Sequence, residues 1–304
     1  MKTQVHLNTI HEFHEFANLP KPEHPLISLI DYSLVEYPVK HSNIKWVQNF
    51  YSIGLKRNVS KRFNYGQQPY DFQEGILAFV APQQVIHIEI DHEAEADPSG
   101  WLLIIHPDFL WGTTLAKNIK KYDFFGYKVN EGLFLSEKEE NMLLAIFKNI
   151  QQEYQSNIDK FSQNIIVTQV ELLLNYAERF YERQFITRNI SNHQILDKLE
   201  EVLSDYFHHK DLLEIGLPTV QYVSDRLNLS PNYLSRMLKL LTGQSTQQHI
   251  HDKLIEKAKE KLSTTNLSIS EIAYELGFEH QASFTRLFRN KTGVSPNKFR
   301  DSFN

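Results

Sequence analysis

The same short pattern occurs twice near the C-terminal end of the chain, and it constrains the fold more than any other feature of the sequence. The first copy spans residues 223–243 and the second spans residues 272–293, and each closes with Thr-Gly. Leu227 and Leu276 correspond at an offset of 49, whereas the arginines in the second half of each copy correspond at an offset of 50. The second copy therefore has one extra residue in its turn. Each copy combines a short apolar-periodic helix, a tight turn and a second helix, which predicts two helix-turn-helix units.

Residues around each turn suit this geometry. Asn228, at the first turn position of the first copy, tolerates a left-handed backbone conformation, and Gly277 occupies the turn of the second copy. Ser230 is expected to cap the helix that follows, and Pro231 suits the first helical position. Between the copies, apolar residues at steps of four predict one continuous helix over residues 245–262. At 1.5 Å per residue this rigid spacer would be roughly 27 Å long.

The second helix of each copy has one apolar face and one polar face. Short polar side chains and Arg near a helix N-terminus match what base edges require, because Arg bonds guanine and Asn bonds adenine bidentately. The spacer would place the two helices near one DNA turn apart, roughly 34 Å, which predicts sequence-specific binding to double-stranded DNA. The outward residues are expected to be Asn232, Ser235, Arg236 and Lys239 in the first copy and Gln281, Thr285, Arg286 and Arg289 in the second, with His280 and Ser283 flanking.

An alternative is that one copy reads bases while the other only binds phosphates. In that case we expect the first copy to read bases, because its polar set is richer. Phosphate contacts position a domain without reading sequence. The expected phosphate contacts are Lys239, His280, Ser283, Arg289, Lys291 and Lys298.

The charge of the chain is uneven. Residues 217–304 contain twelve Lys/Arg and eight Asp/Glu, whereas residues 1–216 contain twenty Lys/Arg and twenty-nine Asp/Glu. A basic part on an acidic body agrees with a nucleic-acid-binding module attached to another domain. The chain has no Cys, which excludes disulfides, thiolate zinc sites and cysteine nucleophiles. It has no apolar run long enough for a membrane span and no secretory signal, so we expect a cytoplasmic protein without membrane contact.

The residue pattern over 1–130 is typical of a β domain. Short segments rich in aromatic and branched residues are separated by Pro, Gly, Asn and Asp, which predicts a sandwich or a small barrel. The expected strands are 27–32, 46–55, 75–80, 85–90 and 101–105.

From Ser136 the apolar period becomes helical. Two long helices are expected, one following the capping signal Ser136-Glu-Lys-Glu139 and one over residues 160–183. They would pack on the β domain and also present a stripe to a partner subunit, with intramolecular packing alone as the alternative. Polar residues 188–193 are expected to form the interdomain linker, and residues 195–207 the first helix of the C-terminal domain.

Over residues 219–301 the chain resembles the AraC/XylS family of bacterial transcription regulators. The resemblance rests on Leu276-Gly277-Phe278, Phe284-Thr-Arg286-Leu-Phe288-Arg289 and Thr292-Gly293-Val-Ser295-Pro296, together with the spacer pattern from Lys253 to Leu262. It implies base contacts from Asn232, Ser235, Arg236, Gln281, Ala282, Thr285 and Arg286. Three residues depart from the family pattern: Ala282 stands where a polar base reader is common, Lys253 where Arg is usual, and His249 in place of an aromatic residue.

The resemblance also implies a fold class and a function for the whole chain. The expected fold is multi-domain α+β, with a cupin-like sensor barrel over residues 1–135, a helical dimerisation segment over 136–187 and an all-α domain with two helix-turn-helix motifs over 192–304. Such a homodimer would bind promoter DNA and RNA polymerase, and would activate transcription in response to a small-molecule effector. We expect no enzyme activity and no cofactor.

Other candidate sites lie in the front half. Phe63, Tyr65, Tyr70 and Phe72 alternate and would line an effector pocket, with ordinary core and rim packing as the alternative. No His-x-His occurs, so we expect no metal site, and the acidic residues 91–97 read as a solvated loop rather than a calcium site. Two rival readings remain: an effector-independent regulator whose barrel is purely structural, and a metal-dependent cupin enzyme fused to a DNA-binding domain.

Overall fold

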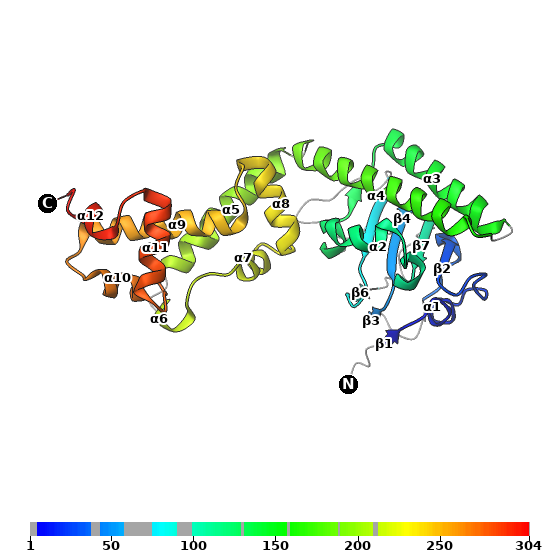
Figure 1. Cartoon of the computed structure of the whole chain (residues 1–304), viewed down its shortest axis with the longest axis horizontal. Coiled ribbons are helices and arrows are strands. Elements are labelled where there is room, and N and C mark those ends of the chain that lie inside the picture. Colours follow the sequence, from blue (N-terminus) through cyan, green and yellow to red (C-terminus); the bar gives the residue numbers. More distant parts are fainter. Residues whose placement is uncertain are drawn as a thin grey trace. The chain divides into compact units, whose positions relative to one another are not determined.

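The computed structural model of the chain divides into two compact units, Met1–Gln184 (unit 1) and Phe185–Asn304 (unit 2) (Figure 1). The strands lie in unit 1, whereas the described part of unit 2 is helical. The residues that the structure describes are 5–37, 43–57, 75–89, 99–128, 131–156, 159–187, 189–208 and 212–303.

Unit 1 is built on two β-sheets. A three-stranded sheet has the order β1-β3-β6, and a five-stranded sheet has the order β2-β7-β4-β5-β8. Strands β1 and β3 run parallel, and the other neighbouring pairs run antiparallel. The strands are β1 (Val5–Leu7), β2 (Ile27–Asp31), β3 (Asn43–Gln48), β4 (Tyr51–Arg57), β5 (Ile76–Val80), β6 (Val85–Glu89), β7 (Ser99–Ile105) and β8 (Leu133–Phe134).

The chain changes sheets at a corner between β3 and β4. The single strand predicted over residues 46–55 is wrong, because pairing breaks after Gln48. The buried Gln48 amide donates to the carbonyl oxygen of Phe50 (2.9 Å) and to Ser52 Oγ (2.6 Å), which holds the corner while the Phe50 ring enters the core. As a result, the pairs β3–β6 and β4–β5 form one ribbon that bends from one sheet into the other.

The strands of the described residues form two open sheets, so the closed cupin-like barrel expected from the resemblance is not confirmed. The other four predicted strands are confirmed, with ends shifted by no more than two residues. One core cluster joins both sheets to the short helix α1 (Ile10–Phe16). Its buried members include Phe13, Trp46, Phe50, Leu102 and Ile104.

Two long helices, α3 (Glu137–Gln155) and α4 (Ser162–Thr187), cover one face of the five-stranded sheet (Figure 1). The N–H of Ser136 donates to the Glu139 carboxylate (2.9 Å), which confirms the predicted capping signal. The buried apolar face of α3 includes Leu143, Ile146, Phe147 and Ile150, whereas Met142, expected on the same face, is exposed. The remaining short elements of unit 1 are α2 (Thr114–Asn118) and the 3-10 turns η1 (Tyr32–Leu34), η2 (Pro107–Leu110), η3 (Ile119–Lys121) and η4 (Asp123–Gly126).

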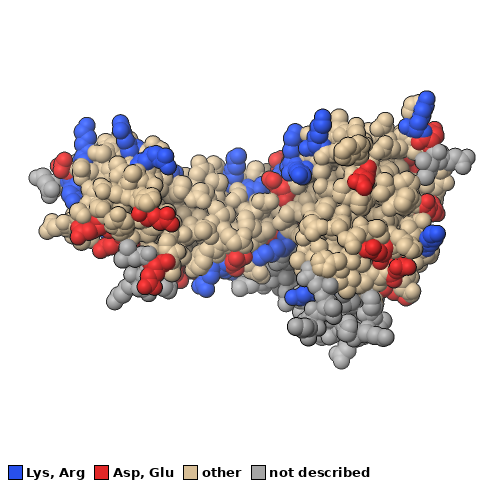
Figure 2. Space-filling model, turned by 60° about the horizontal axis from the view of Figure 1, so that its bottom comes forward, with Lys and Arg blue, Asp and Glu red and all other residues tan. Residues whose placement is uncertain are grey.

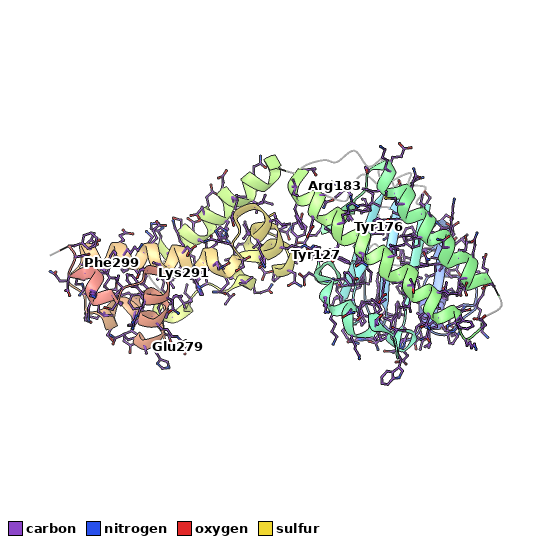
Figure 3. All side chains as sticks on the ribbon, turned by 45° about the horizontal axis from the view of Figure 1, so that its top comes forward. Tyr127, Tyr176, Arg183, Glu279, Lys291 and Phe299 are labelled. Atoms are coloured by element: carbon purple, nitrogen blue, oxygen red, sulfur yellow. The ribbon has the colours of Figure 1, made fainter. Side chains whose placement is uncertain are left out.

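The last turns of α4 within unit 1 are fastened to β8. Arg183 donates two hydrogen bonds to the Glu139 carboxylate (3.0 and 2.6 Å) and one to the carbonyl oxygen of Phe134 (2.8 Å), and Figure 3 labels it near the end of α4. The buried Gln184 side chain accepts from the N–H of Phe134 (2.8 Å) and donates to the carbonyl oxygen of Gly132 (3.3 Å). The Gln184 amide therefore pairs with β8 as a neighbouring strand would.

Unit 2 places its helices around a shared core. Residues from α5, α6, α9, α10 and α11 form one apolar cluster that includes Phe207, Leu254, Ile272 and Phe284. The helices are α5 (Asn189–His208), α6 (Leu212–Ile215), α7 (Val220–Arg226), α8 (Pro231–Thr242), α9 (Thr246–Thr264), α10 (Ile269–Glu275), α11 (Gln281–Thr292) and α12 (Pro296–Arg300).

Residues 189–193, expected from the sequence to lie in an interdomain linker, are helical. Helix α4 ends at Thr187 and α5 begins at Asn189, so nearly all of that segment is helical. A polar stretch without apolar periodicity extends a helix when the following residues supply the buried stripe. Leu199, Leu203 and Phe207 supply that stripe in α5.

Candidate nucleic-acid interface

The first helix-turn-helix unit consists of α7 and α8. Thr219 Oγ1 accepts from the N–H of Tyr222 (3.0 Å) at the start of α7. Asn228 follows α7 with a φ of 56°, the left-handed conformation predicted for it. Ser230 Oγ then accepts from the N–H of Tyr233 (3.3 Å), and Pro231 opens α8, so both predicted capping roles are confirmed.

The second unit consists of α10 and α11. Ser268 and Glu271 form a reciprocal capping box at the start of α10, and these hydrogen bonds lower the pKa of Glu271. Gly277 occupies the turn with a φ of 85°. Helix α11 begins at Gln281, five residues after Leu276, whereas α8 begins four residues after its counterpart. The extra residue predicted in the second turn is therefore confirmed.

The two reading helices, α8 and α11, end in the same way. Gly243 and Gly293 have φ values of 77° and 79°, and their N–H groups donate to carbonyl oxygens four residues earlier. The preceding Thr242 and Thr292 each donate a hydroxyl bond of 2.8 Å back into their own helix. This shared ending indicates that the two copies are structural as well as sequence repeats.

Each reading helix buries its apolar face and exposes much of its polar face. The buried residues are Tyr233, Leu234, Met237 and Leu238 on α8 and Phe284 and Phe288 on α11. Of the seven residues expected to read bases, four are exposed: Asn232, Gln281, Ala282 and Arg286. The other three, Ser235, Arg236 and Thr285, are half-buried.

Ser235 does not have the free hydroxyl that the sequence suggested. Its Oγ lies 2.9 Å from Oγ1 of the buried Thr246, at the start of α9. The corresponding pair in the second repeat is Thr285 and Pro296, and Pro has no hydroxyl to bond. The Ser235 hydroxyl is therefore engaged within the domain, whereas Thr285 faces a surface hollow.

That hollow lies along α11 and has a volume of about 610 Å³. It gathers every residue of α11 expected to read bases, together with Arg289, one of the expected phosphate contacts. Sequence reasoning missed one lining residue, Asn290. Its position four residues after Arg286 places it on the same helix face, which is the signal that would have found it. The lining residues are Gln281, Ala282, Thr285, Arg286, Arg289 and Asn290.

The six expected phosphate contacts are all exposed, but one of them already has a partner. Lys291 Nζ lies 2.6 Å from Asp252 Oδ1, and the Lys291 side chain is 27% exposed. In the left part of Figure 2, which is unit 2, Lys and Arg side chains gather along the upper edge. On the face shown, these positive charges therefore lie together along one edge.

Helix α9 links the two units of the repeat. It has 19 residues, so it is about 28 Å long at 1.5 Å per residue. The N–H of Ser245 donates to the Gln248 side chain (2.7 Å) in a capping box, and the predicted continuous spacer is confirmed.

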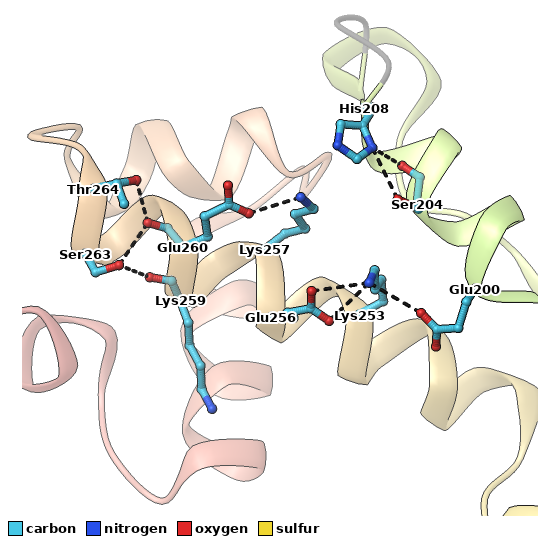
Figure 4. Close-up of polar contacts among 10 residues, drawn as sticks. All are labelled: Glu200, Ser204, His208, Lys253, Glu256, Lys257, Lys259, Glu260, Ser263 and Thr264. Atoms are coloured by element: carbon cyan, nitrogen blue, oxygen red, sulfur yellow. Dashed lines mark hydrogen bonds and ion pairs between the residues drawn. The ribbon is translucent and has the colours of Figure 1, made fainter. Parts of the chain in front are cut away.

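Three lysines four residues apart on α9 pair with carboxylates, and Figure 4 shows the first two of them, Lys253 and Lys257. Lys253 lies 3.3 Å from Glu200 of α5 and 3.2 Å from Glu256. Lys257 pairs with Glu260 (3.0 Å), and Lys261 pairs with Glu275 of α10 (2.6 Å). These charges are matched within the domain and are poorly placed to contribute to a phosphate contact.

His249, which departs from the family pattern, packs at the start of α9. Its Nε2 lies 2.9 Å from Thr242 Oγ1, whose own proton goes to the carbonyl oxygen of Leu238 (2.8 Å), so the imidazole is the donor. Burial lowers the pKa of His249, while the nearby Asp252 carboxylate opposes this. A neutral imidazole therefore fills the aromatic position and fixes the loop after α8.

Three further predictions concern an effector pocket, a metal site and a membrane span. Phe63, Tyr65, Tyr70 and Phe72 lie outside the described residues. The described part of the chain holds no group of three His, Cys, Asp or Glu side chains that would bind a metal ion. None of its described helices is long and apolar enough to span a membrane.

Comparison with known proteins supports the family assignment. A helix-turn-helix domain family matches residues 223–302. The multiple antibiotic resistance protein MarA of Escherichia coli K12 is 36% identical over 114 residues, which cover 38% of this chain and 81% of MarA. The chain belongs to the AraC/XylS family.

Two longer relatives match this AraC/XylS protein over a smaller share of their length. The arabinose operon regulatory protein of Escherichia coli K12 is 31% identical over 129 residues, covering 42% of this chain and 44% of the relative. The HTH-type transcriptional regulator YfiF of Bacillus subtilis 168, itself uncharacterised, is 34% identical over 146 residues, covering 48% and 43%. The matched segments therefore span less than half of these two regulators.

Proposed function

We propose that this protein is a transcription regulator that binds double-stranded promoter DNA through both α8 and α11. The observation that carries the proposal is the repeat itself: two reading helices with polar outer faces, each ended by a left-handed Gly, joined by one continuous helix of 19 residues. A spacer of about 28 Å suits two helices that enter major-groove segments about one turn, roughly 34 Å, apart.

The two helices would contribute unequally to base recognition. The outward residues of α11 share one hollow, and Gln281 and Arg286 are exposed there. On α8 the Ser235 hydroxyl is bonded to Thr246, which leaves Asn232 and Arg236 as the main candidates. We therefore expect α11 to contribute more to base recognition than α8. The sequence alone favoured α8, because the first copy has the richer set of outward polar residues. Lys239, His280, Ser283, Arg289 and Lys298 would contact phosphates.

For unit 1 we propose sensing and dimerisation. Residues 1–135 would bind a small-molecule effector, residues 136–187 would transmit the signal and pair two copies, and residues 192–304 would bind DNA. The exposed Ile165 (44%) and Leu172 (42%), seven residues apart on α4, support an apolar stripe available to a second copy. Activation through RNA polymerase would follow from a ligand-dependent shift between dimer arrangements.

The test begins with selection of bound duplexes from a random-sequence library by the full-length chain. We expect an enriched site with two conserved segments about one helical turn apart. Arg236→Ala and Arg286→Ala should each weaken binding to that site by about 1–3 kcal/mol and relax preference at one position.

The matched control is Lys148→Ala, which removes one exposed positive charge from α3. It should leave binding to the selected site unchanged. Failure to enrich any sequence, or wild-type affinity in both Arg variants, would contradict the proposed recognition.

A further inference from the structure

Unit 1 contains a cavity of about 240 Å³ that the proposed function does not use. It lies between β2, the turn η2 and the helices α3 and α4, on the helix-covered side of the sheet. Because a water molecule occupies about 30 Å³, this space corresponds to roughly eight waters or a ligand of about eight to ten non-hydrogen atoms. The cavity is therefore the right size for a small metabolite rather than for a peptide.

The inner part of the cavity is apolar and aromatic. Phe109, Tyr154 and Ile166 line it and are buried. The imidazole of His24 packs edge-on against the Phe109 ring, with centroids 5.6 Å apart and an interplanar angle of 85°. Aromatic rings in such an arrangement accept the apolar body of a ligand and attract a cation over their faces.

The polar part of the cavity is acidic. Glu153 of α3 is half-buried in the lining, Asp108 of η2 lies at the exposed rim, and Asp159 precedes α4. The Asp159 carboxylate already accepts from the N–H groups of Phe161 (2.7 Å) and Ser162 (3.1 Å). None of the described residues that line the cavity is Lys or Arg.

His24 does not supply a compensating positive charge. Burial lowers the pKa of His24, so the imidazole is neutral at pH 7. Its Nδ1 accepts from the N–H of Leu26 (3.1 Å), which leaves the proton on Nε2. The cavity therefore combines up to three negative carboxylates with neutral polar groups and no Lys or Arg, and this gives it a negative potential.

We propose that this cavity binds a small organic cation, namely a protonated amine carried on an apolar or aromatic body. The ammonium group would sit near Glu153, where a charge-assisted hydrogen bond replaces the water it loses. The apolar body would lie against Phe109, Tyr154 and Ile166. An anion of the same size is excluded by the carboxylates.

The test uses three probes of matched shape on the full-length chain: benzylammonium, benzyl alcohol and benzoate. Isothermal titration calorimetry at pH 7 should show benzylammonium binding with a dissociation constant of about 1 mM or lower. Benzyl alcohol should bind about tenfold more weakly, because it lacks the charge-assisted bond. Benzoate should not bind. Benzoate binding as well as benzylammonium, or no binding of any probe, would overturn the proposal.

Two variants locate the site. Glu153→Gln keeps the shape of the side chain but removes its charge, and should weaken benzylammonium binding about tenfold while leaving benzyl alcohol binding unchanged. Glu137→Gln is the control, because it makes the same change about 24 Å away on the same helix. Equal affinity of both variants for benzylammonium would place the cation elsewhere.

The binding measurement does not depend on the proposed function. Only the further step, that such a ligand alters promoter binding, rests on the protein being a DNA-binding regulator. A chain that binds benzylammonium but no DNA would leave the cavity proposal intact and overturn the proposed function. A chain that binds DNA but none of the probes would overturn the cavity proposal and leave DNA binding intact.

Discussion

The turn of the second helix-turn-helix unit lies against the backbone of the segment after α6: a Cβ atom at Gly277 would be 2.9 Å from the carbonyl carbon of Gly216. Gly277 also has a φ of 85°. Two separate requirements, a left-handed backbone and a close approach to another backbone, therefore fall on one residue. Tyr206 donates to the same Gly216 carbonyl group (2.9 Å), which ties the contact to α5.

Gly277→Ala should destabilise unit 2 by about 2–4 kcal/mol, because strain at positive φ adds to a backbone clash. Guanidinium unfolding followed by far-ultraviolet circular dichroism measures the effect. Gly293→Ala is the matched control, since Gly293 has a similar φ of 79° but nothing within 4 Å of its Cβ position. The control should cost only about 1–2 kcal/mol. Equal losses in the two variants would show that the contact with Gly216 is unimportant.

Ser235 should act mainly on stability. Ser235→Ala removes the partner of the buried Thr246 hydroxyl, and should cost about 1 kcal/mol in the free energy of unfolding. The double variant Ser235→Ala with Thr246→Val should recover most of that loss, because removing both polar groups is nearly neutral. Loss of base discrimination in Ser235→Ala at unchanged stability would instead support the reading role assigned from the sequence.

The Lys291–Asp252 pair should limit non-specific DNA binding. While Asp252 holds Lys291, that lysine adds little to phosphate binding, so Lys291→Ala should barely change the salt dependence of affinity. Asp252→Asn should free Lys291 and steepen the slope of log affinity against log salt by about one unit.

Lys298→Ala provides the comparison for that pair. Lys298 is exposed at the start of α12, and its loss should flatten the slope by about one unit. A similar flattening in Lys291→Ala would mean that Lys291 leaves Asp252 when DNA binds.

The free energy of unfolding should fall in mild acid because unfolding lets His14 take up a proton. Burial lowers the pKa of His14, whose Nδ1 contacts the carbonyl oxygen of Pro20 and whose Nε2 lies 2.9 Å from Ser28 Oγ. In mild acid the unfolded chain then binds more protons than the folded chain. The contribution of His14 to the free energy of unfolding is therefore complete above the unfolded pKa of about 6.5, and it is lost as the pH falls below that value. Denaturant unfolding between pH 8 and pH 5 measures the slope, which should be shallower in His14→Gln. An unchanged slope would assign the acid sensitivity to other groups.

The helix-turn-helix repeat could be predicted from the sequence because its turn and capping residues act on the nearby backbone. Asn228, Ser230 and Pro231 act on the backbone within three residues, so their roles do not depend on distant parts of the chain. The continuous spacer was likewise visible from apolar residues four apart.

The features that the sequence did not predict depend on hydrogen bonds and ion pairs made by side chains. The corner after Gln48 depends on its side chain, which bonds the carbonyl oxygen of Phe50 and the hydroxyl of Ser52, and a strand pattern contains no sign of such bonds. The bond between Ser235 and Thr246 joins two different helices, so a helical wheel placed Ser235 outside. In the same way, the pairing of Lys291 with Asp252 spans 39 residues and was invisible in a count of local charges.

Contacts along α9 hold this helix to its neighbours within the domain. Lys253 ties α9 to Glu200 of α5, Lys261 ties it to Glu275 of α10 in the second unit, and the bond between Ser235 and Thr246 joins it to α8 of the first unit. DNA that contacts both α8 and α11 would therefore have to present its two contacted segments at one fixed spacing. Inserting about five base pairs between the two contacted segments would rotate one of them to the opposite side of the double helix, out of reach even with every base unchanged.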